Sequence, residues 1–140
     1  MSNVRFGLIG YGAWGGHHAN AIAKTTGAEL VAIAARSEDS CQRAKSDFPS
    51  ASIYNDYNKL LESENLDVVD IVLPSHLHLE ASTAALSSGR HLLLEKPMAL
   101  SVSDCESLIQ LAKEKDRILA VGHELRLSSM WAKVKEMVDE

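Results

Sequence analysis

Three glycines near the N-terminus follow an apolar run at a spacing that has a chemical use. Gly10, Gly12 and Gly15 form a G-x-G-x-x-G directly after residues 5–9. In this pattern the first glycine allows a tight turn, the second lets the backbone approach a pyrophosphate, and the third lets the next helix pack closely. The start of that helix points free N–H groups and a positive dipole end at the phosphates. The motif predicts a dinucleotide site, and the alternative is three glycines that serve only a tight turn. The residues expected at this part of the site are Gly10, Tyr11, Gly12, Ala13, Trp14 and Gly15.

The end of the second apolar run, residues 30–35, indicates which dinucleotide is preferred. An acidic residue there would bond the adenosine ribose 2′-hydroxyl and repel a 2′-phosphate. The chain instead has Arg36 and Ser37, and a guanidinium with a neighbouring hydroxyl suits a phosphate. We therefore predict NADP in preference to NAD. NAD stays open, because Glu38 and Asp39 lie close by and Arg36 can be an ordinary loop residue.

Two further polar segments follow the apolar runs 68–73 and 91–94. The first is Leu73-Pro74-Ser75-His76-Leu77-His78, and the second is Glu95-Lys96-Pro97. In an open sheet of parallel strands, ligands bind at the carboxyl ends of the strands. These segments therefore complete the expected site, with Leu73, Pro74, Ser75, His78, Glu95 and Lys96 as its residues.

Short apolar runs alternate along the chain with longer amphipathic stretches, and these elements must position the motifs. The expected strands are residues 5–9, 30–35, 52–54, 68–73, 91–94 and 118–121. The expected helices are residues 14–25, 38–47, 57–63, 76–88, 102–115 and 129–138. The continuous apolarity of the strands is typical of a parallel sheet covered on both faces. The alternation predicts a doubly wound α/β fold of the Rossmann type, with strand order 3-2-1-4-5-6.

Composition limits the class of protein. The 140 residues are 46% hydrophobic and 24% charged, which is the balance of one ordinary domain. A formal charge of −5 disfavours nucleic acid as a partner. No apolar run approaches the roughly 18 residues that span a bilayer, and the N-terminus has no secretory pattern. Cys41 and Cys105 form neither a disulfide framework nor a metal-binding spacing, so we expect no metal and a cytoplasmic location.

Taken together, the motifs resemble the Gfo/Idh/MocA family of oxidoreductases, which includes glucose–fructose oxidoreductase and inositol dehydrogenase. The resemblance covers essentially the whole chain. The tripeptide Glu95-Lys96-Pro97 is its most specific element, because it follows a short apolar strand 80 residues after Gly15. The other matching segments are the glycine turn with His18, Pro74-Ser75-His76-Leu77-His78, Gly89-Arg90-His91, and Gly122-His123 with Arg126.

The resemblance implies roles for individual residues. Lys96 matches the family lysine beside the nicotinamide and the reacting carbon, where it would orient the substrate hydroxyl and help move its proton. A buried lysine can have a lowered pKa, which suits this role; the alternative is a structural pair with Glu95, its expected orienting partner. His78 matches a histidine near the cofactor and is the second catalytic candidate, unless it only opens a helix. Ser75 stands where the family often has asparagine, and we expect His18 to be structural.

The family enzymes have a second α/β domain, which supplies most substrate contacts. We therefore expect residues 1–122 to form the NAD(P)-binding domain. Residues 123–140 are expected to be a linking helix to a substrate domain that is absent from this chain. Trp131 would then lack a packing partner, so we predict a homo-oligomer.

The resemblance implies hydride transfer between NADP(H), or NAD(H), and a sugar, inositol or related polyol or keto compound. The isolated chain is expected to bind the nicotinamide dinucleotide with little turnover, since the substrate would need the absent domain. The alternative is a non-catalytic NAD(P)-binding sensor or partner module. A methyltransferase that uses S-adenosylmethionine is disfavoured by the full glycine motif and by Glu95-Lys96-Pro97.

Overall fold

Six parallel strands form one sheet in the order β3-β2-β1-β4-β5-β6. The computed structural model describes residues 2–139. The strands are β1 (Val4–Ile9), β2 (Ala28–Ala34), β3 (Ser52–Tyr54), β4 (Val68–Ile71), β5 (His91–Glu95) and β6 (Leu119–Gly122). The doubly wound Rossmann fold predicted from the sequence is confirmed, including its strand order.

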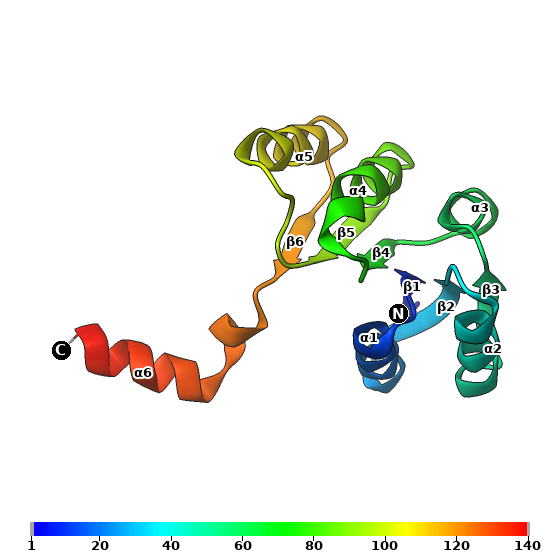
Figure 1. The fold of residues 1–140 in the computed structure, drawn as a ribbon, viewed down its shortest axis with the longest axis horizontal. Coiled ribbons are helices and arrows are strands. Elements are labelled where there is room, and N and C mark those ends of the chain that lie inside the picture. The colour runs from blue at the N-terminus through cyan, green and yellow to red at the C-terminus, as the bar shows by residue number, and fades with distance from the viewer. Residues whose placement is uncertain (1, 140) are drawn as a thin grey trace.

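Helices cover both faces of this sheet. They are α1 (Ala13–Lys24), α2 (Glu38–Asp47), α3 (Tyr57–Ser63), α4 (His78–Ser87), α5 (Val102–Glu114) and α6 (Ser129–Asp139), with 3-10 turns η1 (Ser75–Leu77) and η2 (Glu124–Leu127). Figure 1 shows α1 and α2 on one side of the sheet and α3, α4 and α5 on the other. The last helix, α6, extends away from the sheet. None of the described helices is both long and apolar enough to cross a membrane.

The core consists of two apolar clusters, one on each side of the sheet. Along β1, Leu8 belongs to the cluster under α1 and α2, whereas its neighbour Ile9 belongs to the cluster under α4 and α5. Along β2, Ile33 and Ala32 divide in the same way. Successive side chains of a strand point to opposite faces, so a strand with helices on both sides must be apolar at every position. This explains why the apolar runs are continuous.

Side-chain caps define the starts of three helices. Ser37 Oγ accepts a hydrogen bond from Ser40 N at 3.2 Å, and Asp56 accepts one from Asn58 N at 2.8 Å. Ser101 Oγ accepts from Asp104 N at 3.1 Å, which makes Ser101 the cap of α5. These bonds satisfy N–H groups that lack a partner within the helix.

Two predicted boundaries are wrong for a shared reason near Pro74. The strand predicted over 68–73 ends at Ile71, and the helix predicted over 76–88 begins as the 3-10 turn η1 before α4 starts at His78. Proline has no N–H for a strand ladder, so it favours a loop at this point. Leu73 and Pro74 therefore lie in the loop between β4 and α4.

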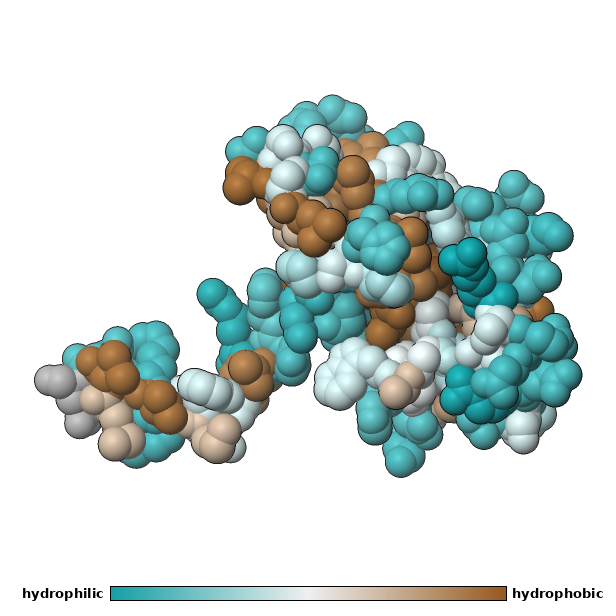
Figure 2. Space-filling view, in the orientation of Figure 1, coloured by the Kyte–Doolittle hydropathy of each residue, from teal (hydrophilic) through white to brown (hydrophobic). Residues whose placement is uncertain are grey.

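The segment 123–139 begins with a 3-10 turn before its helix. The turn η2 comes first, and an extended Ser128 separates it from α6. Figure 2 shows brown, apolar patches along the projecting helix. The exposed large apolar side chains of α6 are Met130, Trp131, Val134, Met137 and Val138.

Candidate functional site

The glycine turn between β1 and α1 contains glycines of two kinds. Packing within the protein requires a glycine at two of the three positions, but not at the third. Gly10 has a φ of +106°, and a Cβ on it would lie 2.1 Å from the carbonyl oxygen of Val72. A Cβ on Gly15 would lie 2.0 Å from the carbonyl oxygen of Gly10. A Cβ on Gly12 would have no described atom within 4 Å. A tight turn alone therefore accounts for Gly10 and Gly15, whereas Gly12 borders open space of the kind that a bound phosphate needs.

The start of α1 faces the same turn. Gly12 is the N-cap of α1, it makes no side-chain cap, and the first turn carries no acidic residue. The first N–H groups of a helix have no partner within the helix. An uncapped start without a carboxylate leaves these donors and the positive dipole end available to an anion. The residues present therefore fit a dinucleotide pyrophosphate.

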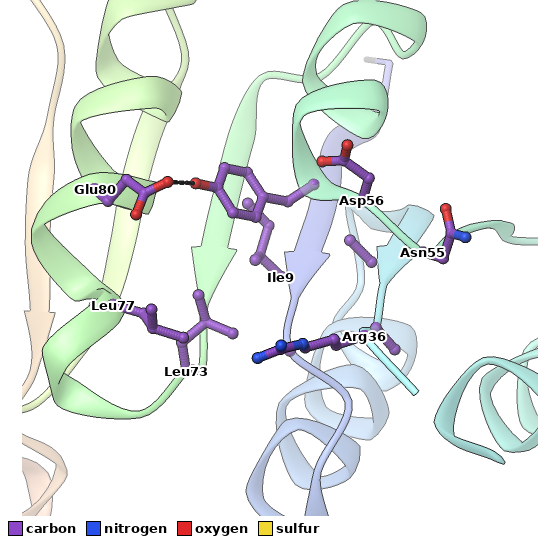
Figure 3. A pocket seen from close by; sticks show the side chains of 11 residues that line it. Ile9, Arg36, Asn55, Asp56, Leu73, Leu77 and Glu80 are labelled. Carbon is purple, nitrogen blue, oxygen red and sulfur yellow. Dashed lines mark hydrogen bonds between the residues drawn. The ribbon is translucent and has the colours of Figure 1, made fainter. Parts of the chain in front are cut away.

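A cavity of about 360 Å³ lies beside the turn, between the ends of β1 and β2 and the helices α3 and α4. Figure 3 shows Ile9, Leu73 and Leu77 within it and Arg36 crossing its lower edge. The Tyr57 hydroxyl donates to Glu80 Oε1 at 2.8 Å, which joins α3 to α4 across the cavity. Sequence reasoning missed four polar residues of its lining, namely Asn55, Asp56, Tyr57 and Glu80.

A second depression, of about 480 Å³, connects Arg36 with the start of α2. Ser37 Oγ donates to Ser40 Oγ at 2.9 Å, and Arg43 Nη2 donates to Ser40 Oγ at 3.0 Å. Arg36 borders both depressions. The position of Arg36 after β2 identified the start of this group, but Ser40 and Arg43 join it only because α2 turns them to the same side.

Tyr11 was expected to contribute to the site, but its side chain is directed into the core. The ring is buried and lies edge-on to Phe48, with ring centroids 6.2 Å apart. The hydroxyl donates to Asp47 Oδ2 at 2.7 Å. Burial, followed by the bond to Asp47, raises the pKa of Tyr11 to about 12. Only the backbone of Tyr11 remains for a ligand at the turn.

Four side chains from α1, β4 and β5 form a chain of hydrogen bonds. His18 Nδ1 lies 2.8 Å from Asp70 Oδ2, and His18 Nε2 lies 3.2 Å from Glu95 Oε1. Trp14 Nε1 donates to Glu95 Oε1 at 2.9 Å. Within residues 2–139 no three His, Cys, Asp or Glu side chains are arranged to hold a metal ion.

The Lys96 side chain is exposed, whereas a buried lysine with a lowered pKa was considered for its role. The alternative, a structural ion pair with Glu95, is not found among the described residues, where the Glu95 carboxylate is engaged by Trp14, His18 and the Lys96 backbone N–H. Lys96 instead borders a depression of about 330 Å³ with His123 and Arg126.

Comparison with known proteins identifies the family. Residues 4–123 match the sequence model described as "Oxidoreductase family, NAD-binding Rossmann fold", that of the Gfo/Idh/MocA proteins. The chain belongs to this family. The resemblance seen in the motifs is thereby confirmed, and the fold is an NAD(P)-binding Rossmann domain of an oxidoreductase.

Relatives within the Gfo/Idh/MocA family are longer than this chain. The oxidoreductase YdgJ of Escherichia coli is 34% identical over 139 residues, which cover 99% of this chain and 39% of YdgJ. Myo-inositol 2-dehydrogenase of Thermotoga maritima is 31% identical over 136 residues, which cover 97% of this chain and 41% of that enzyme. The chain thus spans about two fifths of the length of these relatives.

Solved structures of the Gfo/Idh/MocA family agree with the fold. Scyllo-inositol dehydrogenase of Lactobacillus casei, determined with bound NAD(H) and scyllo-inositol, superposes with a TM-score of 0.90. It is 27% identical to this chain, and the match covers 99% of this chain and 41% of that one.

The position of His78 favours a structural role over the predicted catalytic one. The imidazole is fully buried, with Nδ1 2.7 Å from the Pro97 carbonyl oxygen and Nε2 2.8 Å from the Leu73 carbonyl oxygen. His78 connects the loop after β4 with the loop after β5, and in the described residues its ring has no open face toward a ligand.

Proposed function

We propose that this chain is the NADP(H)-binding part of an oxidoreductase that transfers a hydride between the nicotinamide and a sugar, inositol or related polyol or keto compound. The observation that carries the proposal is the glycine turn: packing requires Gly10 and Gly15, whereas Gly12 borders open space at the start of α1. Polyol substrates are supported by the inositol dehydrogenases among the similar proteins.

The chain's own residues divide the work of binding between two ends of the site. The N–H groups at the start of α1 bind the pyrophosphate, and the cavity beside Ile9 and Tyr57 receives the adenosine. At the other end, Lys96 Nζ holds the substrate hydroxyl and accepts or returns its proton. When bound, the nicotinamide supplies the hydride chemistry, and the protein supplies orientation and charge. The exposure of Lys96 leaves its Nζ available to such a substrate.

The preference for NADP rests on the group of polar side chains at the start of α2. This group offers two guanidinium groups and two hydroxyls, and the oxygens of a 2′-phosphate can accept hydrogen bonds from such groups. Its members are Arg36, Ser37, Ser40 and Arg43. No carboxylate ends β2, where one would bond a ribose 2′-hydroxyl. Asp39 opposes this preference only weakly, because it is exposed and lies 3.2 Å from Arg43 Nε.

Parallel fluorescence titrations with NADPH and NADH test this function. We expect the chain to bind NADPH tighter by about tenfold or more, the size of one charge-assisted contact. Arg36→Ala should abolish most of that difference. Arg126→Ala is the matched control, because it removes the same charge far from α2 and should leave the ratio unchanged. Equal affinity for the two nucleotides contradicts the NADP preference, and binding of neither contradicts the proposed function.

We also propose that residues 1–122 form the cofactor domain and that residues 123–140 form a linking segment. The exposed apolar side chains of α6, including Trp131 and Val134, support this division because such a face usually packs on another surface. We propose that in the isolated chain the apolar face of α6 packs on a second copy of the chain. Sedimentation should then show a dimer that Trp131→Glu converts to a monomer, and a monomeric unmodified chain contradicts the self-association.

A further inference from the structure

Two carboxylates from neighbouring strands lie on either side of one imidazole. Asp70 belongs to β4 and is 1% exposed, and Glu95 ends β5 and is 8% exposed. Asp70 Oδ1 has no hydrogen-bond partner in the described residues, so the contact of Oδ2 with His18 is its polar support. Burying two carboxylates side by side is unfavourable unless a cation or several donors compensate them. His18 touches both.

The geometry favours the doubly protonated form of His18. Its two ring nitrogens lie 2.8 Å from Asp70 Oδ2 and 3.2 Å from Glu95 Oε1. With both carboxylates ionised, a neutral imidazole would direct a lone pair at one of these oxygens, whereas an imidazolium donates to both. Burial raises the pKa of Asp70, and its hydrogen bond with His18 opposes that rise. The hydrogen bond that His18 makes to Asp70 raises the pKa of His18 against the opposing effect of burial. The other titratable side chain beside this group is the exposed His17, next in sequence and near Trp14.

Glu95 links His18 to the backbone of Lys96. Its Oε1 accepts from Trp14 Nε1 and contacts His18, while its Oε2 accepts from the Lys96 N–H at 3.0 Å. On β6, a Cβ on Gly122 would lie 3.3 Å from Glu95 Oε1, so this glycine leaves the carboxylate its space. The orientation of one carboxylate thus determines where the Lys96 peptide lies.

We propose that His18 is a positioning residue that holds Glu95 against Asp70 as an imidazolium and thereby sets the backbone of Lys96. The sequence predicted only a structural histidine at this position. The effect on cofactor binding rests on the proposed function, because that function places Lys96 at the nicotinamide end. The contacts of His18 with Asp70 and Glu95, which we call the clamp, lie within this chain.

The matched pair of variants is His18→Asn and His17→Asn, two neighbouring histidines of which only the first touches the carboxylates. The first readout is the ¹⁵N–¹H resonance of the Lys96 amide, which reports its bond to Glu95 without any ligand. We expect an upfield shift of the Lys96 proton in His18→Asn and none in His17→Asn. An unchanged Lys96 resonance in a folded His18→Asn overturns the proposal.

The second readout compares NADPH with adenosine 2′,5′-bisphosphate, which lacks the nicotinamide. His18→Asn should weaken NADPH by about tenfold and leave the bisphosphate within about twofold. Equal weakening of both ligands overturns a role at the nicotinamide end. If the unmodified chain binds neither ligand, the proposed function fails, and the amide resonance still decides the clamp.

A rescue variant keeps the test decisive if His18→Asn does not fold. In His18→Gln/Asp70→Asn, the new amide at position 70 can donate to the new carbonyl at position 18, whose amide can donate to Glu95. We expect this neutral pair to restore the Lys96 resonance and the NADPH affinity, whereas His18→Gln alone should not, because its carbonyl would face the Asp70 carboxylate. Failure of the double variant to restore the Lys96 resonance contradicts the clamp.

Discussion

The carbonyl oxygen of Gly10 lies where a side chain on Gly15 would begin, 2.0 Å from an ideal Cβ. The first turn of α1 therefore packs directly on the end of β1, and no side chain fits between them. Gly10 is constrained as well, by its φ of +106° and by the Val72 carbonyl. Gly12, between them in sequence, has neither constraint. The same motif thus holds glycines of two kinds, which substitution to alanine can separate.

Alanine at the three glycines should separate folding from binding. We expect Gly10→Ala and Gly15→Ala each to lower the unfolding free energy by about 3 kcal/mol, because the backbone must move. Gly12→Ala should fold with nearly unchanged stability and lose most of its affinity for NADPH, since its methyl group occupies the space of the pyrophosphate. Thermal unfolding and NADPH titration check both effects, and undiminished NADPH affinity of Gly12→Ala would place the phosphates elsewhere.

The contribution of His18 to stability should depend on pH. Its pKa is raised above the ordinary 6.5, mainly by the bond to Asp70. The folded chain therefore holds this proton more tightly than the unfolded chain does, so the stabilisation is complete below about pH 6.5 and is lost as pH rises through the folded-state value. The loss of unfolding free energy in His18→Asn should be largest near about pH 6 and smaller near about pH 9. Urea unfolding of variant and parent across this range tests the sign, and a growing loss with rising pH contradicts it.

Tyr11 should matter for stability and little for the cofactor. Tyr11→Phe removes the hydroxyl that donates to Asp47 at 2.7 Å and keeps the edge-on contact with Phe48. We expect a loss of about 1 kcal/mol in unfolding free energy and an NADPH affinity within about twofold of the parent. Chemical unfolding and NADPH titration are the measurements. A large loss of affinity with unchanged stability would assign the Tyr11 side chain to the site after all.

His78 should behave as a connector of two loops. His78→Leu leaves the carbonyl oxygens of Leu73 and Pro97 without their buried donor, so we expect a loss of about 2 kcal/mol or more in unfolding free energy. His76→Leu is the control, because His76 is exposed in the preceding turn. Thermal unfolding of the two variants checks this. Equal stability of the two would remove the connecting role and return His78 to the catalytic candidates.

Local signals in the sequence were sufficient for the fold. Continuous apolar runs and the alternation of strands with amphipathic stretches are properties of neighbouring residues, and the structure agrees with both. The boundaries near Pro74 were less accurate, because the apolar Val72 and Leu73 continue the pattern of a strand after the ladder has ended. Hydrophobic patterning records burial, and a loop beside a ligand cavity can be as apolar as a strand.

Only those parts of the candidate site that depend on local patterns were predicted. The glycine turn, Arg36 and Lys96 stand in recognisable local patterns, so the sequence by itself determined a dinucleotide-binding Rossmann domain and its family. Only the tertiary structure decided that Tyr11 turns into the core, that Tyr57 meets Glu80 across the cavity, and that His18 joins Asp70 to Glu95. These relationships join residues 23 to 77 positions apart. They depend on which strands are adjacent and which way each helix faces, and no pattern of neighbouring residues encodes that.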